Sequence, residues 1–121
     1  MAKRLLIVDD EETLTFSLYQ SFILSQQDYE VVTANSGEEA LKKSRDLPFD
    51  LIITDIWMPG INGFDLIRQV KQEQPQTEFV VMTAYGSSDN RERAIKEGAR
   101  SYIEKPFEMK EMKKLVMDIL G

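Results

Sequence analysis

Five short apolar runs alternate with longer amphipathic stretches along this chain, and that order limits the fold more than any other feature. Three of the runs, at residues 5–8, 51–53 and 79–82, have no polar alternation and are rich in β-branched residues. This pattern is typical of strands covered on both faces, as in a parallel sheet. The runs at residues 31–32 and 102–103 are shorter and more polar, as edge strands tend to be.

The stretches between the runs carry the signals of helices. Leu14, Leu18 and Phe22 form one apolar stripe at helical spacing. Ser36 and Glu39 have the spacing of a capping box, with Ser36 as the N-cap and Glu39 reaching back. The strand-helix unit is repeated five times, and we expect right-handed crossovers between the strands. This predicts an α/β fold: a doubly wound, five-stranded parallel sheet with five helices divided between its two faces.

The length and two absent residue types narrow the chemistry. A chain of 121 residues fits one domain, which we assign to residues 1–121. The chain has no cysteine and no histidine, which excludes disulfides, thiolate or imidazole metal ligands and a Ser-His triad. A metal would therefore be held by oxygen, which favours Mg²⁺ or Ca²⁺ over Zn²⁺.

Charge and hydropathy also bear on partners and location. Lys and Arg total 15 against 21 Asp and Glu, a net charge of −6, which argues against direct binding of nucleic acid. No apolar run approaches the roughly 20 residues that span a bilayer. The N-terminus leads into a short apolar stretch that Asp9 ends, so we expect no signal peptide and no membrane association. These features predict a cytoplasmic protein.

The candidate site residues follow the predicted strands. In a doubly wound sheet, ligands bind at the carboxyl ends of the strands, near the point where strand order reverses. Asp9 and Asp10 follow the first run, and Asp55 follows the third. Thr83 ends the fourth run, and Lys105 follows the fifth. Three carboxylates, one hydroxyl and one ammonium group are therefore expected at the same rim.

Each rim residue also has a plainer explanation. Acids near a helix N-terminus stabilise the helix by roughly 0.3–1 kcal/mol, and we assign Glu11 and Glu12 this role. That role explains Asp9 and Asp10 less well, because crowded carboxylates raise one another's pKa unless a cation neutralises them. Mg²⁺ prefers a few carboxylates together with waters and phosphate oxygens. Taken alone, Asp55 fits a turn residue, Thr83 fits a strand end and Lys105 fits a solvated surface lysine. Only the complete set indicates a site.

With these residues in place, the chain resembles the receiver domain of bacterial two-component response regulators, over residues 5–120. The resemblance rests on an acidic pair in residues 6–11, Thr-Asp-Ile-Trp-Met-Pro-Gly at 54–60, Asn-Gly at 62–63, Met-Thr-Ala at 82–84 and Lys-Pro-Phe at 105–107. Each motif alone is unspecific, but all of them in this order and at these spacings are highly specific. The resemblance implies a flavodoxin-like receiver fold with strand order 2-1-3-4-5.

The resemblance also implies a phosphorylation site that contains Mg²⁺. Asp55 would accept a phosphoryl group from a sensor histidine kinase, a phosphotransfer protein or a small phosphodonor. Asp10 and Asp55 would bind Mg²⁺ directly, and Asp9 would help through water. The backbone carbonyl of Trp57 would supply a further ligand. Such a chain catalyses only its own phosphorylation and slow dephosphorylation, so we do not expect an enzyme that acts on other substrates.

Further roles implied by the resemblance concern the switch. Thr83 would hydrogen-bond a phosphoryl oxygen, and Lys105 would pair with it; the bond between Lys105 and Pro106 is expected to be cis. Thr83 would move toward the phosphoryl group and Tyr102 would turn inward, although Tyr102 also fits a plain edge-strand aromatic. The fourth helix, fifth strand and last helix would then form the surface that controls a partner or an output domain.

Several alternatives bear on this interpretation. The bulk of Trp57 and Tyr85 beside the phosphoryl group predicts slow self-hydrolysis. A flavin binder of the same fold needs a hydroxyl- and glycine-rich loop after the first strand, where this chain is acidic. An aspartyl phosphatase needs a second acid at the position of Trp57. A receiver-like binding module that works without phosphorylation remains the main alternative. The sequence is compatible with a free-standing receiver, with part of a larger regulator, and with a phosphorylation-dependent homodimer.

Overall fold

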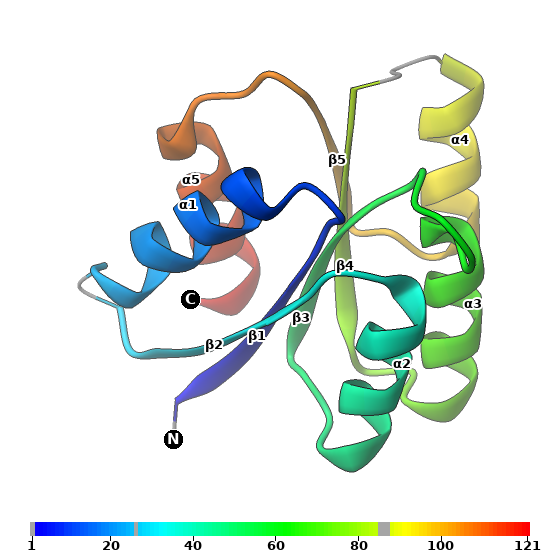
Figure 1. The fold of residues 1–121 in the computed structure, drawn as a ribbon, viewed down its shortest axis with the longest axis horizontal. Coiled ribbons are helices and arrows are strands. Elements are labelled where there is room, and N and C mark those ends of the chain that lie inside the picture. Colours follow the sequence, from blue (N-terminus) through cyan, green and yellow to red (C-terminus); the bar gives the residue numbers. More distant parts are fainter. Residues whose placement is uncertain (1, 26, 85–87) are drawn as a thin grey trace.

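The computed structural model describes residues 2–25, 27–84 and 88–121, and strands and helices alternate throughout this part of the chain (Figure 1). The strands are β1 (Lys3–Val8), β2 (Tyr29–Ala34), β3 (Leu51–Asp55), β4 (Glu78–Thr83) and β5 (Ser101–Glu104). The helices are α1 (Glu12–Ile23), α2 (Gly37–Asp46), α3 (Gly63–Glu73), α4 (Ser88–Glu97) and α5 (Met109–Leu120). The predicted repetition of strand and helix is confirmed.

All strand pairs in the sheet are parallel, and the strand order is β2-β1-β3-β4-β5. Helices α1 and α5 cover one face, while α2, α3 and α4 cover the other (Figure 1). The fold class and the strand order are therefore as predicted. The chain leaves β1 toward β2 on one side and returns to β3 on the other, so the loops after β1 and β3 lie at the point where strand order reverses.

Two hydrophobic layers explain why the central runs are apolar without alternation. Leu5 and Ile7 of β1 point into the layer beneath α1 and α5, while Leu6 and Val8 point into the layer beneath α2, α3 and α4. All four side chains are fully buried. Successive residues of a strand face opposite sides, so a strand covered on both faces must be apolar at every position.

Helix α2 begins with the capping box that the sequence indicated, with one difference. The Ser36 hydroxyl accepts the backbone N–H of Glu39 at 3.1 Å, so Ser36 is the N-cap. The Glu39 carboxylate reaches back one residue further than expected and accepts the backbone N–H of Asn35 at 2.7 Å. This hydrogen bond lowers the pKa of Glu39, because it stabilises the charged form.

No helix in the described ranges is long and apolar enough to cross a membrane.

Candidate functional site

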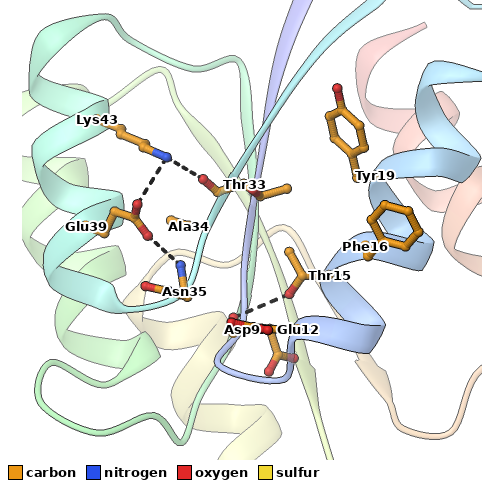
Figure 2. Close-up of a pocket in the computed structure, with 10 residues that line it drawn as sticks. All are labelled: Asp9, Glu12, Thr15, Phe16, Tyr19, Thr33, Ala34, Asn35, Glu39 and Lys43. Carbon is orange, nitrogen blue, oxygen red and sulfur yellow. Dashed lines mark hydrogen bonds and ion pairs between the residues drawn. The ribbon is translucent and has the colours of Figure 1, made fainter.

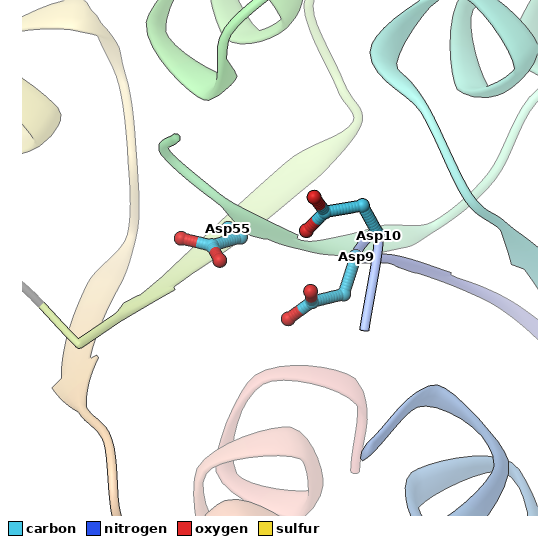
Figure 3. Close-up of side chains that lie close together, drawn as sticks. All are labelled: Asp9, Asp10 and Asp55. Carbon is cyan, nitrogen blue, oxygen red and sulfur yellow. The ribbon is translucent and has the colours of Figure 1, made fainter. Parts of the chain in front are cut away.

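Three carboxylates converge at the carboxyl edge of the sheet. Oxygen atoms from Asp9, Asp10 and Asp55 all lie within 4.8 Å of one another (Figure 3). Asp9 and Asp55 are buried, at 1% and 8% exposure, whereas Asp10 is exposed. The expected gathering of these residues is confirmed. A set of carboxylate oxygens without nitrogen or sulfur ligands suits a hard cation such as Mg²⁺.

The Asp9 carboxylate is held by the turn from β1 into α1. Its Oδ1 accepts the backbone N–H of Glu11 at 2.9 Å. The backbone N–H of Asp9 donates to the carbonyl of Ala34 at 3.2 Å, which continues the pairing of β1 with β2. The Thr15 hydroxyl contacts the carbonyl of Asp9 at 3.4 Å and that of Glu11 at 3.1 Å. These contacts direct the second carboxylate oxygen of Asp9 toward the site.

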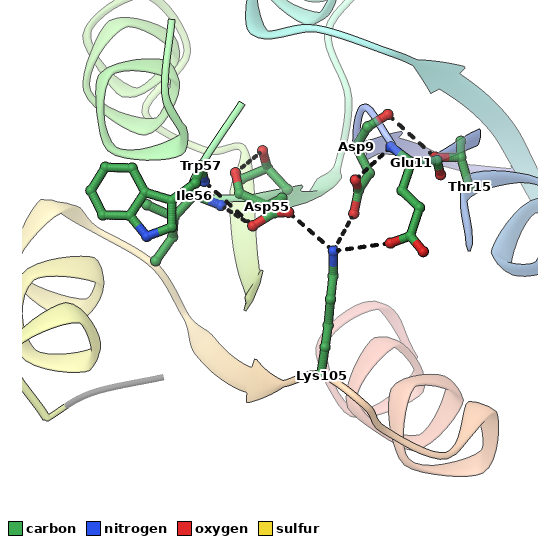
Figure 4. Close-up of polar contacts among 8 residues, drawn as sticks. Asp9, Glu11, Thr15, Asp55, Ile56, Trp57 and Lys105 are labelled. Atoms are coloured by element: carbon green, nitrogen blue, oxygen red, sulfur yellow. Dashed lines mark hydrogen bonds and ion pairs between the residues drawn. The ribbon is translucent and has the colours of Figure 1, made fainter. Parts of the chain in front are cut away.

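Asp55 is fixed by the backbone that follows it. Its Oδ1 accepts the N–H of Ile56 at 2.7 Å and lies 3.4 Å from the N–H of Trp57 (Figure 4). The carbonyl of Ile56 in turn accepts the N–H of Gly63 at 2.7 Å, which brings the start of α3 against the end of β3. Oδ2 of Asp55 is left facing Lys105.

Lys105 joins the two buried carboxylates. Its Nζ lies 2.7 Å from Oδ2 of Asp9 and 3.0 Å from Oδ2 of Asp55 (Figure 4). Burial alone lowers the pKa of this ammonium, but the hydrogen bonds and charges of Asp9 and Asp55 outweigh that effect and raise it. The peptide bond to Pro106 is cis, as predicted. An ammonium group beside the acids therefore supplies part of the positive charge that the cluster needs.

Glu11 lies at the N-terminus of α1, where an acid was expected, and its side chain makes one further contact. It occupies the N-cap position of α1, but its side chain makes no capping hydrogen bond. Its carboxylate instead lies 3.8 Å from Nζ of Lys105. Glu11 therefore lies at the helix N-terminus as expected, and its side chain also faces a cation supplied by a distant part of the chain. Glu12, in the first turn of α1, is placed as expected for an acid at a helix N-terminus.

The burial of Asp9 makes its charge costly. Desolvation raises the pKa of its carboxyl above the ordinary value of 3.8, and the hydrogen bonds from Lys105 and Glu11 offset this only in part. The charge of Asp55 raises the pKa further. A buried acid with a raised pKa gives stability below pH 3.8 that is lost as pH rises through the higher value in the folded state.

The raised pKa of Asp9 in the folded state leads to a prediction for Asp9→Asn. We expect the variant to be more stable than the wild type at pH 7 in EDTA, with a difference that shrinks as pH falls toward 3.8. Urea unfolding of both proteins between pH 4 and pH 8 measures this difference, and the effects of carboxylates remote from Asp9 cancel in the comparison. A constant difference across that range, or a less stable variant at pH 7, would contradict it.

The switch residues expected from the sequence share one face of the sheet. Thr83 ends β4 and is fully buried, and its carbonyl accepts the backbone N–H of Lys105 at 2.9 Å. Tyr102 of β5 lies opposite Val81 and packs against the same hydrophobic layer as Val81, beneath α3 and α4. Thr83 follows Val81 by two residues, so its side chain points to that face too. Tyr85 lies outside the described residues.

A groove of about 400 Å³ adjoins the acidic cluster between α1 and α2 (Figure 2). Phe16 and Tyr19 of α1 line one wall. On the other wall, Lys43 donates to the carbonyl of Thr33 at 2.6 Å and pairs with Glu39 at 3.2 Å. Lys43 and Glu39 thus hydrogen-bond to backbone groups at the end of edge strand β2 and just after it. Those groups are then not available to pair with another strand. No pattern in the sequence indicated this groove.

A second depression, of about 380 Å³, opens beside Lys105. It is lined by Leu14 of α1, Ala84, and the loop from Lys105 to Phe107. Small Ala84 leaves space next to the ammonium group. Lys105 can therefore be approached from this side.

A doubly wound sheet with an acidic cluster and a buried lysine at its carboxyl edge is the arrangement of a receiver, the switch domain of two-component signalling. Residues 5–117 match the family model described as the response regulator receiver domain, and the chain belongs to this family. A receiver domain is a signalling switch and not a classical enzyme.

The relatives agree with this family. The chain is 34% identical over 120 residues to the alkaline phosphatase synthesis transcriptional regulatory protein PhoP of Bacillus subtilis, covering 99% of this chain and 49% of PhoP. It is 38% identical over 109 residues to the chemotaxis protein CheY of Thermotoga maritima, covering 89% of each. The solution structure of the beryllofluoride-activated NtrC4 receiver domain dimer superposes with a TM-score of 0.87 at 38% identity, covering 96% of this chain and 94% of that one.

Proposed function

We propose that this chain is a phosphorylation-activated switch in which Asp55 accepts the phosphoryl group. The observation that supports this proposal most directly is the position of the Asp55 carboxylate. It offers an oxygen within 4.8 Å of oxygens of Asp9 and Asp10, and it lies 3.0 Å from the ammonium of Lys105. The donor is a sensor histidine kinase or a phosphotransfer protein, because the chain has no histidine of its own. Acetyl phosphate serves as a small substitute.

The transfer needs positioning and charge neutralisation more than proton transfer. An oxygen of Asp55 attacks phosphorus as the P–N bond to the donor histidine breaks, and the electron pair leaves with the imidazole. The transition state is loose and carries its charge on the phosphoryl oxygens. Lys105 neutralises part of that charge, and the Thr83 hydroxyl hydrogen-bonds a phosphoryl oxygen. A carboxylate nucleophile carries no proton that must be removed, so no general base is required.

The metal of this proposal is Mg²⁺. Asp10 and Asp55 would hold it directly, Asp9 would help through water, and the carbonyl of Trp57 would supply a further ligand. When bound, Mg²⁺ supplies positive charge to the phosphoryl oxygens. The donor set supports this choice, since the cluster offers only oxygen.

The switch uses the shared face of β4 and β5. A phosphoryl group adds about −1.5 to −2 charge and three acceptor oxygens. Thr83 shifts toward them, and Tyr102 turns into the space that Thr83 leaves. The affected surface consists of α4, β5 and α5, where Ile95 is 49% exposed. That surface controls a partner protein or an output domain.

The setting of the switch is also a proposal. Residues 1–121 form one receiver unit that acts in the cytoplasm and does not bind nucleic acid directly. The chain spans about half of PhoP but 89% of CheY, so both an attached output domain and a separate target have a counterpart among the relatives. The NtrC4 receiver is a dimer in its beryllofluoride-activated form, which supports testing for a homodimer after phosphorylation.

The direct test is the intact mass after incubation with acetyl phosphate. We expect a gain of one phosphoryl group with Mg²⁺ and no gain in EDTA, with the group located on the peptide that contains Asp55. No gain with Mg²⁺ from acetyl phosphate or from a phosphorylated histidine donor would overturn the proposal and favour a binding module that works without phosphorylation.

Metal binding gives an independent prediction. Mg²⁺ binds the folded cluster and not the unfolded chain, so it should stabilise the protein by about 2.7 kcal/mol at a concentration 100 times its Kd. Thermal unfolding in EDTA and in increasing Mg²⁺ measures this effect. Asp10→Asn should reduce it, because one direct ligand is lost. An unchanged melting temperature at all Mg²⁺ concentrations would contradict the metal assignment.

A further inference from the structure

Three side chains from separate elements form a stack beside the phosphoacceptor site. The indole of Trp57, in the loop after β3, meets the ring of Phe64 edge to face, with centroids 6.0 Å apart and an angle of 89°. The guanidinium carbon of Arg93 in α4 lies 4.2 Å from the centroid of the same Phe64 ring. Phe64, in the first turn of α3, is fully buried between them.

The stack matters because of where Trp57 sits. Its backbone N–H lies 3.4 Å from Oδ1 of Asp55, and Figure 4 shows its indole directed away from Lys105. Trp57 is 43% exposed as a residue, and the ring of Phe64 packs against its indole. Contact with Phe64 therefore restricts the side chain, and with it the backbone that borders the Asp55 carboxylate.

We propose that Arg93 is a positioning residue for the phosphoacceptor site: it fixes Phe64, which fixes Trp57 and the backbone next to Asp55. A cation over a ring is attracted by the electrons of the ring face, which favours one placement of the ring. The consequence for phosphorylation rests on the proposed function. The consequence for the mobility of Trp57 does not, so the two can be tested separately.

The first measurement uses Trp57, the only tryptophan, as a reporter. Arg93→Met keeps a long apolar side chain but removes the charge. In EDTA, we expect stronger acrylamide quenching of Trp57 fluorescence in this variant than in the wild type. Arg93→Lys retains a cation that can lie over the ring, and it should restore quenching most of the way to the wild-type value.

The matched control is Arg68→Met. Arg68 of α3 also links that helix to α4, through Glu97 at 3.3 Å, and it pairs with Asp65 of its own helix at 3.1 Å, but it belongs to no part of the stack. This variant makes the same chemical change between the same two helices. We expect its Trp57 quenching to equal that of the wild type.

The second measurement is Mg²⁺ affinity, followed by the change in Trp57 fluorescence, together with the rate of phosphorylation by acetyl phosphate. We expect Mg²⁺ binding to be weaker in Arg93→Met by up to about fivefold, the upper limit that the full energy of an exposed cation–π contact sets. Arg93→Lys should recover most of it, and Arg68→Met should not change it.

The outcomes separate the two proposals. Wild-type quenching and Mg²⁺ affinity in Arg93→Met would overturn the positioning role, as would equal changes in Arg68→Met, which would indicate a general loosening of α3 against α4. Altered quenching with Lys rescue supports the positioning of Trp57 even where the wild type itself fails to accept phosphate. That failure would count against the proposed function alone.

Discussion

Replacing Asp55 with asparagine should abolish phosphoryl incorporation entirely and leave the fold intact. The amide oxygen of the new side chain is a far weaker nucleophile than a carboxylate, and an amide does not form the acyl phosphate. The substitution keeps nearly the same shape. The amide oxygen can still accept the backbone N–H of Ile56, which lies 2.7 Å from Oδ1 of Asp55. Lys105 also retains Asp9 at 2.7 Å, so no buried charge loses its last partner.

The measurement is the intact mass after treatment with acetyl phosphate and Mg²⁺, with far-ultraviolet circular dichroism to show that the variant is folded. Asp10→Asn is the matched control, because it also exchanges a carboxylate for an amide in the cluster but keeps Asp55. It should incorporate phosphate more slowly and recover at higher Mg²⁺. A phosphoryl group on folded Asp55→Asn would mean that another residue is the acceptor.

The second large effect is expected for Gly63→Ala. An added Cβ at this position would press against the carbonyl oxygen of Asp55 and lie 2.9 Å from the Cα of Ile56. Both contacts are with backbone, which cannot rotate away as a side chain can. Gly63 also donates to the carbonyl of Ile56 at 2.7 Å, so moving α3 outward would weaken that hydrogen bond.

We expect this variant to lose about 1–3 kcal/mol of stability, the usual cost of forcing atoms into a filled region. Mg²⁺ affinity should fall as well, because the clash lies in the backbone of the phosphoacceptor itself. Urea unfolding and Mg²⁺ titration measure the two effects. Gly121→Ala is the control without a clash: a Cβ there meets nothing within 4 Å, so any loss of stability in that variant reports only the backbone strain of its positive φ of 84°. Unchanged stability and metal binding in Gly63→Ala would contradict this prediction and show that α3 moves away from β3 at little cost in free energy.

The sequence indicated the importance of Asp55 more clearly than that of Gly63. Asp55 was recognisable from its place after an apolar run and from the motif around it. Gly63 was recognisable only as part of the Asn-Gly pair at residues 62–63. That its missing Cβ makes room for the carbonyl of Asp55 depends on how closely α3 approaches β3, which is a matter of packing.

The sequence by itself determined the elements and their order. Apolar runs without alternation require cover on both faces, and stripes at helical spacing supply it, so the doubly wound sheet follows from local patterns. A parallel sheet brings its carboxyl ends to one edge, and this alone predicts that the candidate residues gather there: Asp9, Asp10, Asp55, Thr83 and Lys105.

Only the tertiary structure decided how those side chains are paired. Lys105 meets Asp9 across 96 residues of sequence, and the Glu11 carboxylate at the start of α1 lies 3.8 Å from the same ammonium group. The position of Arg93 over Phe64 likewise had no signal in the sequence. Periodicity reports which face of an element is buried, because that depends on neighbouring residues. Contacts between distant side chains depend on the distances and angles at which whole elements pack, and local patterns do not contain them.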